Sequence, residues 1–277
     1  EGNHDTSIYS EENSWLYFLS RKDYVKLLQT KFDKGEPVVC KWNKTSKVGS
    51  YIDYGDIRIF GVGYLGASTK KKIELLEPNL KLNKFNIMML HASINSMLFS
   101  DLGGIKKEEI EIIKNKINYL ALGHIHKKYE LDNWIFNPGS LENWRVDEAS
   151  YQKGFFHVKL ESNKIKEVVF KESKRRPVYN WEVDISGCKD SNDVFKAVIN
   201  FINKNKPSKE PVEKPIIILT YIGKVDFSTL QIDNDFIKKE VEELFDIKVQ
   251  KVRTIIQSNK KYEIEKLKKE FPAIDVA

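Results

Sequence analysis

Four of the chain's five histidines lie in short segments whose composition suits metal binding or proton transfer. His91 directly follows the apolar run Asn86–Leu90. His124 and His126 follow the apolar run Tyr119–Leu122 through a glycine. Imidazole nitrogen is a common ligand of divalent transition metals, and its pKa near neutrality also suits a general acid or base. These three side chains are therefore candidates for either kind of chemistry.

The fourth histidine, His4, lies in the segment Gly-Asn-His-Asp at the start of the sequence, next to the amide oxygen donor of Asn3. Short apolar runs predict buried strands, and α/β folds bind ligands where such strands end. In an extended segment His124 and His126 point the same way, because side chains repeat every two residues. Neutral nitrogen and oxygen donors favour Mn²⁺, Fe²⁺ or Zn²⁺ over Ca²⁺.

A single histidine beside a strand is more often structural than a ligand, and His157 provides an internal comparison. It alternates with Phe156 and Val158, so it is expected to face away from the core. The other four histidines share positions at strand ends, which a coincidence explains poorly. The sequence therefore predicts one site made from several segments.

The elements that must position this site are mainly strands up to residue 170. A charged stretch without periodic hydrophobicity, residues 171–177, follows them as a linker. The predicted strands are Ile57–Val62, Asn86–Leu90, Tyr119–Leu122, Trp134–Phe136, Gly154–Leu160 and Lys164–Phe170, with a helix over Lys106–Lys116.

A different pattern begins after the linker. The order of strand, amphipathic helix, strand, helix and strand predicts a small α/β domain over residues 178–258. A charged helix over Tyr262–Phe271 belongs to a final segment, residues 259–277. The elements expected in the small domain are Val178–Ile185, Asp190–Asn203, Pro215–Ile222, Asp235–Phe245 and Ile247–Ile256.

The composition of this 277-residue chain is that of a folded protein, with 41% hydrophobic and 31% charged residues. No run approaches the ~20 apolar residues that span a bilayer, so no membrane contact is expected. The cysteines, Cys40 and Cys188, are far apart, which suits a reducing cytoplasm. The net charge of +6 fits either solvated surfaces or contact with a polyanion.

The segments Gly2–Asp5 (GNHD), Leu90–His91 and Gly123–His126 (GHIH) together resemble the last three of five motifs of the calcineurin-like metallophosphoesterases. The lysine after GHIH, the turn NPGS at 137–140 and the small domain resemble the SbcD-type DNA-repair nucleases within that superfamily. The resemblance covers nearly the whole chain. It implies an α/β fold in which a metallophosphoesterase β-sandwich flanked by helices, residues 1–170, precedes a small DNA-capping domain.

The resemblance also implies a site with two divalent metal ions, Mn²⁺ foremost. Asn3, His91 and His124 would bind one ion, and His126 would bind the other. His4 would be a catalytic residue beside the scissile phosphate that protonates the leaving oxygen. Asp5 is a candidate to orient His4, and a turn or cap role for Asp5 is an equal alternative.

The function implied is that of a nuclease, with exonuclease or endonuclease activity, in a complex that repairs DNA double-strand breaks. The partners implied are double-stranded DNA, an SMC-like ATPase subunit of SbcC type and a second copy of the chain. The segment Trp15–Leu28 is the candidate dimer surface, with a core helix as the alternative. The ATPase contact has the least support in the sequence.

The first two motifs of the superfamily, Asp-x-His and Gly-Asp-x-x-Asp, do not precede GNHD in this sequence. These motifs supply carboxylate ligands, so we expect an N-terminally incomplete domain that binds at most one metal weakly and is inactive alone. The alternatives are a general nucleotide or small-molecule phosphodiesterase and a non-catalytic scaffold that binds DNA or a partner.

Overall fold

The computed structural model describes residues 1–5, 14–95, 104–206 and 213–256, and the chain divides into two compact units. The first unit contains Glu1–Glu142 and Tyr151–Ser173. The second contains Asn143–Ser150 and the chain from Lys174 onward. The expected α/β class is confirmed, because helices and a mixed six-stranded sheet occur together. The helix expected at Tyr262–Phe271 lies outside the described residues.

The sheet of the first unit has the strand order β3-β4-β5-β6-β8-β7. Its four central strands run parallel, and the edge strands β3 and β7 are antiparallel to their neighbours. The carboxyl ends of β4, β5 and β6 therefore lie at the same end of the sheet, as the sequence predicts. The strands are β3 (Tyr51–Tyr54), β4 (Ile57–Val62), β5 (Phe85–Leu90), β6 (Tyr119–Leu122), β7 (Tyr129–Leu131) and β8 (Ile135–Asn137).

One face of this sheet is covered by α2 (Thr69–Leu76) and α3 (Lys107–Ile110). Both helices connect parallel strands, and the helix predicted over Lys106–Lys116 is an α-turn followed by the 3-10 turn Glu111–Ile113. Burial of apolar side chains between helices and strands forms the main core. Its fully buried members include Phe60, Ile73, Leu76, Met88, Ile110, Ile113 and Leu120.

The other face of the sheet is covered in part by a hairpin of β9 (Gly154–Glu161) and β10 (Lys164–Glu172), and the sequence predicts both strands. Ser162 and Asn163 have the positive φ angles of a tight hairpin turn. Every second residue of β9 turns inward, and His157 between them is exposed, which confirms its predicted orientation. The inward residues Phe156, Val158 and Leu160 pack against Phe85, Tyr119 and Phe136.

The N-terminal part of the first unit adds a short helix, α1 (Trp15–Arg21), and a hairpin of β1 (Lys31–Asp33) and β2 (Glu36–Val38). Ser14 caps α1 by accepting a hydrogen bond from the Tyr17 backbone N at 3.1 Å. Among the residues of α1, Ser20 is the one that is buried, and Trp15 is 77% exposed. This segment is therefore a surface helix, not the core helix that the sequence left open.

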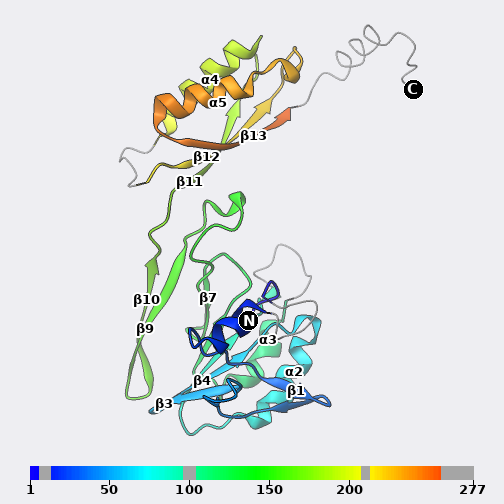
Figure 1. Ribbon diagram of the computed structural model, residues 1–277, viewed down its shortest axis with the longest axis vertical. Helices are drawn as coiled ribbons and strands as arrows, with labels where there is room; N and C mark the ends of the chain where they lie inside the picture. Colours follow the sequence, from blue (N-terminus) through cyan, green and yellow to red (C-terminus); the bar gives the residue numbers. More distant parts are fainter. Residues whose placement is uncertain (6–13, 96–103, 207–212, 257–277) are drawn as a thin grey trace, which may run out of the picture. The chain divides into compact units, whose positions relative to one another are not determined.

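The second unit is a parallel sheet of order β11-β12-β13 with α4 and α5 on one face (Figure 1). All five elements of the small domain are confirmed: β11 (Val178–Asp184), α4 (Ser191–Asn205), β12 (Ile216–Gly223), α5 (Asn234–Phe245) and β13 (Lys248–Ile256). Asp190 and Asp233 cap the two helices. The segment Asn143–Ser150, with a 3-10 turn at Val146–Glu148, contacts β11.

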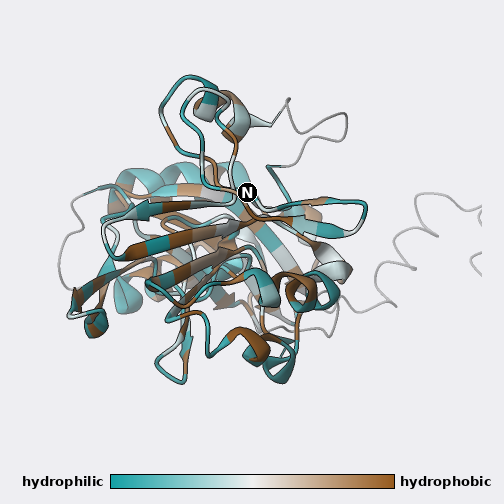
Figure 2. Ribbon diagram, turned by 90° about the horizontal axis from the view of Figure 1, so that it is seen from below, coloured by the Kyte–Doolittle hydropathy of each residue, from teal (hydrophilic) through white to brown (hydrophobic). Residues whose placement is uncertain are grey.

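Hydrophobic residues, brown in Figure 2, are frequent along the strands of the central sheet, whereas the loops around them are mostly teal.

No helix in the ranges given above has the length and apolar content that a membrane crossing requires. Both cysteines are free thiols, with Cys40 exposed and Cys188 half-buried.

Candidate functional site

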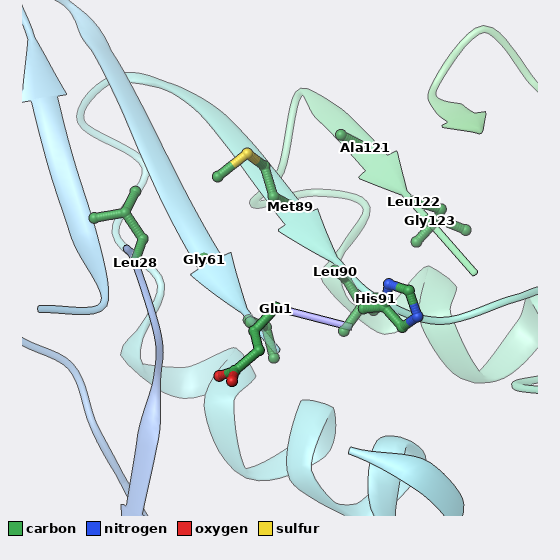
Figure 3. Close-up of a pocket in the computed structure, with 10 residues that line it drawn as sticks. Glu1, Leu28, Gly61, Met89, Leu90, His91, Ala121, Leu122 and Gly123 are labelled. Atoms are coloured by element: carbon green, nitrogen blue, oxygen red, sulfur yellow. The ribbon is translucent and has the colours of Figure 1, made fainter. Parts of the chain in front are cut away.

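The side chain of His91 lies at the carboxyl end of β5, where three segments of the first unit meet (Figure 3). Its backbone N donates to the Val62 carbonyl of β4 at 3.3 Å, and Gly123 N donates to the Leu90 carbonyl at 3.1 Å. A Cβ atom added to Gly2 would lie 2.7 Å from His91 Cε1, and one added to Gly123 would lie 3.2 Å from Nδ1. A side chain at Gly2 would force the His91 ring to shift, and one at Gly123 would contact it tightly.

Three of the predicted ligands converge at this point. Asn3 Oδ1 lies 3.0 Å from His91 Nε2, and His124 Nδ1 lies 3.3 Å from the same nitrogen. Donor atoms with metal bonds of about 2.1 Å are separated by about 3.0–3.4 Å when they share one ion, so this spacing suits a common cation. His124 adopts a φ of +93°, a conformation that costs about 1–3 kcal/mol and requires support from its surroundings.

His4, His126 and Asp5 surround this group. His4 is exposed and His126 is half-buried. His4 lies close enough to influence the ionisation of His91 and of His124, and His126 that of His124. The Asp5 carboxylate accepts a hydrogen bond from the Gly2 backbone N at 2.8 Å, so Asp5 closes the GNHD turn. The structure thus gathers the four predicted histidines at one end of the sheet.

Tyr64 is a member of this site that the sequence analysis did not identify. Its ring lies 6.0 Å from the His124 ring in a stacked arrangement and 5.9 Å from the His91 ring, edge to face. The Tyr64 backbone N also donates to the Glu1 carbonyl at 3.1 Å. Tyr64 follows β4 by one glycine, and this position after a buried strand is the signal that would have found it.

Burial favours the neutral form of two imidazoles of the site, those of His91 and His124. It lowers the pKa of His91 from 6.5 to about 4, and the neighbouring His124 adds to this effect. The pKa of His124 is also lowered, mainly by burial and then by the charges of His126 and His4. Neutral imidazoles keep the lone pair that a metal ion requires.

The NPGS turn supports the backbone of the GHIH segment. Asn137 is fully buried, and its Nδ2 donates to the carbonyls of Ile125 at 2.8 Å and Lys127 at 2.9 Å. Gly139 has a φ of +78°, and a Cβ there would lie 2.6 Å from the His126 carbonyl oxygen. The turn and the histidine segment therefore fit together closely.

The donors that converge are two imidazoles and one amide. Within the described residues, no group of three or more His, Cys, Asp or Glu side chains is arranged to hold a metal, and the third donor beside His91 and His124 is the amide of Asn3. A hollow of about 270 Å³ opens beside His91 on the second face of the sheet (Figure 3). Its other lining residues are mostly apolar, including Leu28, Met89 and Ala121.

No protein-family model matches the chain. The geometry and the chemistry of the site therefore carry the functional conclusion.

Lowering the pH from 6.5 to 4 is expected to destabilise the metal-free first unit through His91. The unfolded chain binds this proton near pH 6.5, whereas the folded protein excludes it down to about pH 4. The unfolded state binds more protons in that window, so stability falls as the pH falls. The His91→Gln variant should show a flatter dependence of the urea midpoint on pH, and parallel profiles for both proteins would contradict this.

Replacing Asn137 by Asp is expected to destabilise the first unit by about 3 kcal/mol or more. The substitution keeps the shape but turns a donor that binds two carbonyls into a buried acceptor that repels them. Urea unfolding measures the change. The exposed Asn200, replaced by Asp, is the control and should change stability by less than about 1 kcal/mol.

Proposed function

We propose that this chain carries a calcineurin-like metallophosphoesterase site of SbcD type, and that this site serves the hydrolysis of phosphodiester bonds of double-stranded DNA. The observation that carries the proposal is the convergence of Asn3 Oδ1, His91 Nε2 and His124 Nδ1 within 3.0 and 3.3 Å. These donors come from three separate segments, each of which holds one of the motifs that suggested the family.

Asn3, His91 and His124 would hold one divalent ion, and His126 is the described residue that would contact a second. A bound ion of this kind, for which Mn²⁺ is our choice, polarises a phosphate oxygen and lowers the pKa of its bound water. The chain's own contribution is to present neutral imidazoles, because burial lowers the pKa values of His91 and His124.

His4 is the proposed proton donor to the leaving oxygen. It is exposed, so a large substrate can reach it, and it lies close enough to His91 and His124 to affect their ionisation. A general acid must sit within hydrogen-bond reach of the atom that it protonates. The Gly2–Asp5 turn, closed by the Asp5 carboxylate, fixes the backbone on both sides of His4.

The finer assignments of fold and partners belong to the same proposal. The hairpin β9–β10 on one face of the sheet and the helices on the other are consistent with a metallophosphoesterase sandwich. The second unit has the element order expected of a DNA-capping domain, and the net charge of +6 suits a polyanionic substrate. The proposal also includes a cytoplasmic location, an SMC-like ATPase partner and a homodimer that forms through the exposed Trp15 and Phe18.

The metal site is tested on the chain itself by titration with Co²⁺, followed by its visible absorption. We expect one ion to bind weakly, and His91→Ala and His124→Ala to weaken binding at least tenfold, because each removes a converging donor. His157→Ala removes an exposed imidazole on β9 and is the matched control. Equal affinities for all four proteins would contradict the site.

The role of His4 is tested by DNA cleavage with this chain joined to a segment that supplies the superfamily's carboxylate motifs, Asp-x-His and Gly-Asp-x-x-Asp. His4→Asn is expected to lower cleavage of linear double-stranded DNA with Mn²⁺ by about 10²- to 10⁴-fold, as for the loss of a general acid. Metal affinity and DNA affinity should stay unchanged. A parallel loss of metal would instead make His4 a ligand.

A further inference from the structure

Lys153 is a buried, positively charged residue beneath the candidate site. Its side chain is about 2% exposed, although lysine is rarely buried without partners. The Lys153 Nζ donates to Ser140 Oγ at 2.9 Å and to the backbone carbonyl of His126 at 3.3 Å. It also lies 5.5 Å from the centre of the Tyr151 ring. The ammonium group thus hydrogen-bonds the backbone of a predicted metal ligand.

The neighbours of Lys153 contact the same part of the chain. Lys127 Nζ lies 5.7 Å from the Tyr151 ring, and Lys128 Nζ lies 3.5 Å from Gln152 Oε1. Residues 151–153 therefore run beside residues 126–128. The return of the chain into the first unit, after the segment Asn143–Ser150, forms this support.

Lys153 completes a set of donors to three consecutive carbonyls. Asn137 binds the carbonyls of Ile125 and Lys127, and Lys153 binds the one between them, that of His126. Hydrogen bonds from a charged donor are shorter and stronger than those from a neutral donor. The strained φ of His124 persists only while the surrounding backbone is held in place.

We infer that Lys153 is a positioning residue that fixes the segment His124–His126 in the geometry required for metal binding. The role of Lys153 in metal binding rests on the proposed function, whereas its role in holding the backbone of His124–His126 does not. Ser140 takes part because its hydroxyl accepts from the Lys153 Nζ and so aims it at the His126 carbonyl.

The test compares Lys153→Met with the wild type by two measurements. The first is Co²⁺ titration, where we expect at least a tenfold weaker affinity and a changed absorption spectrum. The second is amide hydrogen exchange in metal-free protein, where residues 124–128 should exchange faster. Lys159→Met, which removes an exposed lysine of β9, the strand that begins directly after Lys153, is the control and should change neither.

A folded Lys153→Met protein with wild-type exchange at 124–128 and a wild-type Co²⁺ spectrum would overturn the inference. If that variant does not fold, Ser140→Ala is measured instead, because it keeps the Lys153 ammonium group and removes its hydroxyl partner. Faster amide exchange at residues 124–128 is then expected. Unchanged exchange overturns the inference. Absence of Co²⁺ binding by the wild type would refute the proposed function alone, because the exchange measurement still decides the role of Lys153.

Discussion

The packing of the His91 ring between the backbones of Gly2 and Gly123 is the contact on which the candidate site depends. A Cβ on Gly2 would lie 2.7 Å from the ring and one on Gly123 would lie 3.2 Å from it, so a side chain at Gly2 would displace the ring and one at Gly123 would crowd it. Parallel pairing of β4, β5 and β6 brings the segment ends to this edge. The GHIH segment meets His91 there because β6 pairs with β5, and the GNHD segment is held nearby by the hydrogen bond from Tyr64 N to the Glu1 carbonyl.

The same close packing sets the chemistry of the site. Burial depresses the pKa values of His91 and His124, so the converging donors are neutral at physiological pH. A cluster of neutral nitrogen and oxygen donors suits a divalent transition metal and leaves its charge to be balanced by other anionic groups, such as carboxylates or a phosphate substrate. The neighbouring Tyr64 ring, stacked at 6.0 Å from that of His124, limits the space around these donors.

Support for the GHIH segment comes from residues that follow it in the chain. Asn137 and Lys153 bind its carbonyls, and Gly139 permits close contact with His126. Between Ser140 and Lys153 lies the segment Asn143–Ser150, which belongs to the second unit. The Lys153 ammonium group thus links Ser140, which lies just before this segment, to the backbone of the proposed ligand His126.

The sequence by itself determined the strands that end at the site, the outward orientation of His157, and the strand and helix order of the second unit. Apolar runs and the alternation of apolar with polar residues indicate which side chains are buried, because these patterns depend on residues close together in the same strand or helix. Only the tertiary structure decided the short hairpin β1–β2, the contact of Tyr64 with the histidines and the burial of Lys153. It also assigned Asn143–Ser150 to the second unit, whereas the sequence suggested a continuous domain over 1–170. These features depend on contacts between residues far apart in the chain, which no local pattern records.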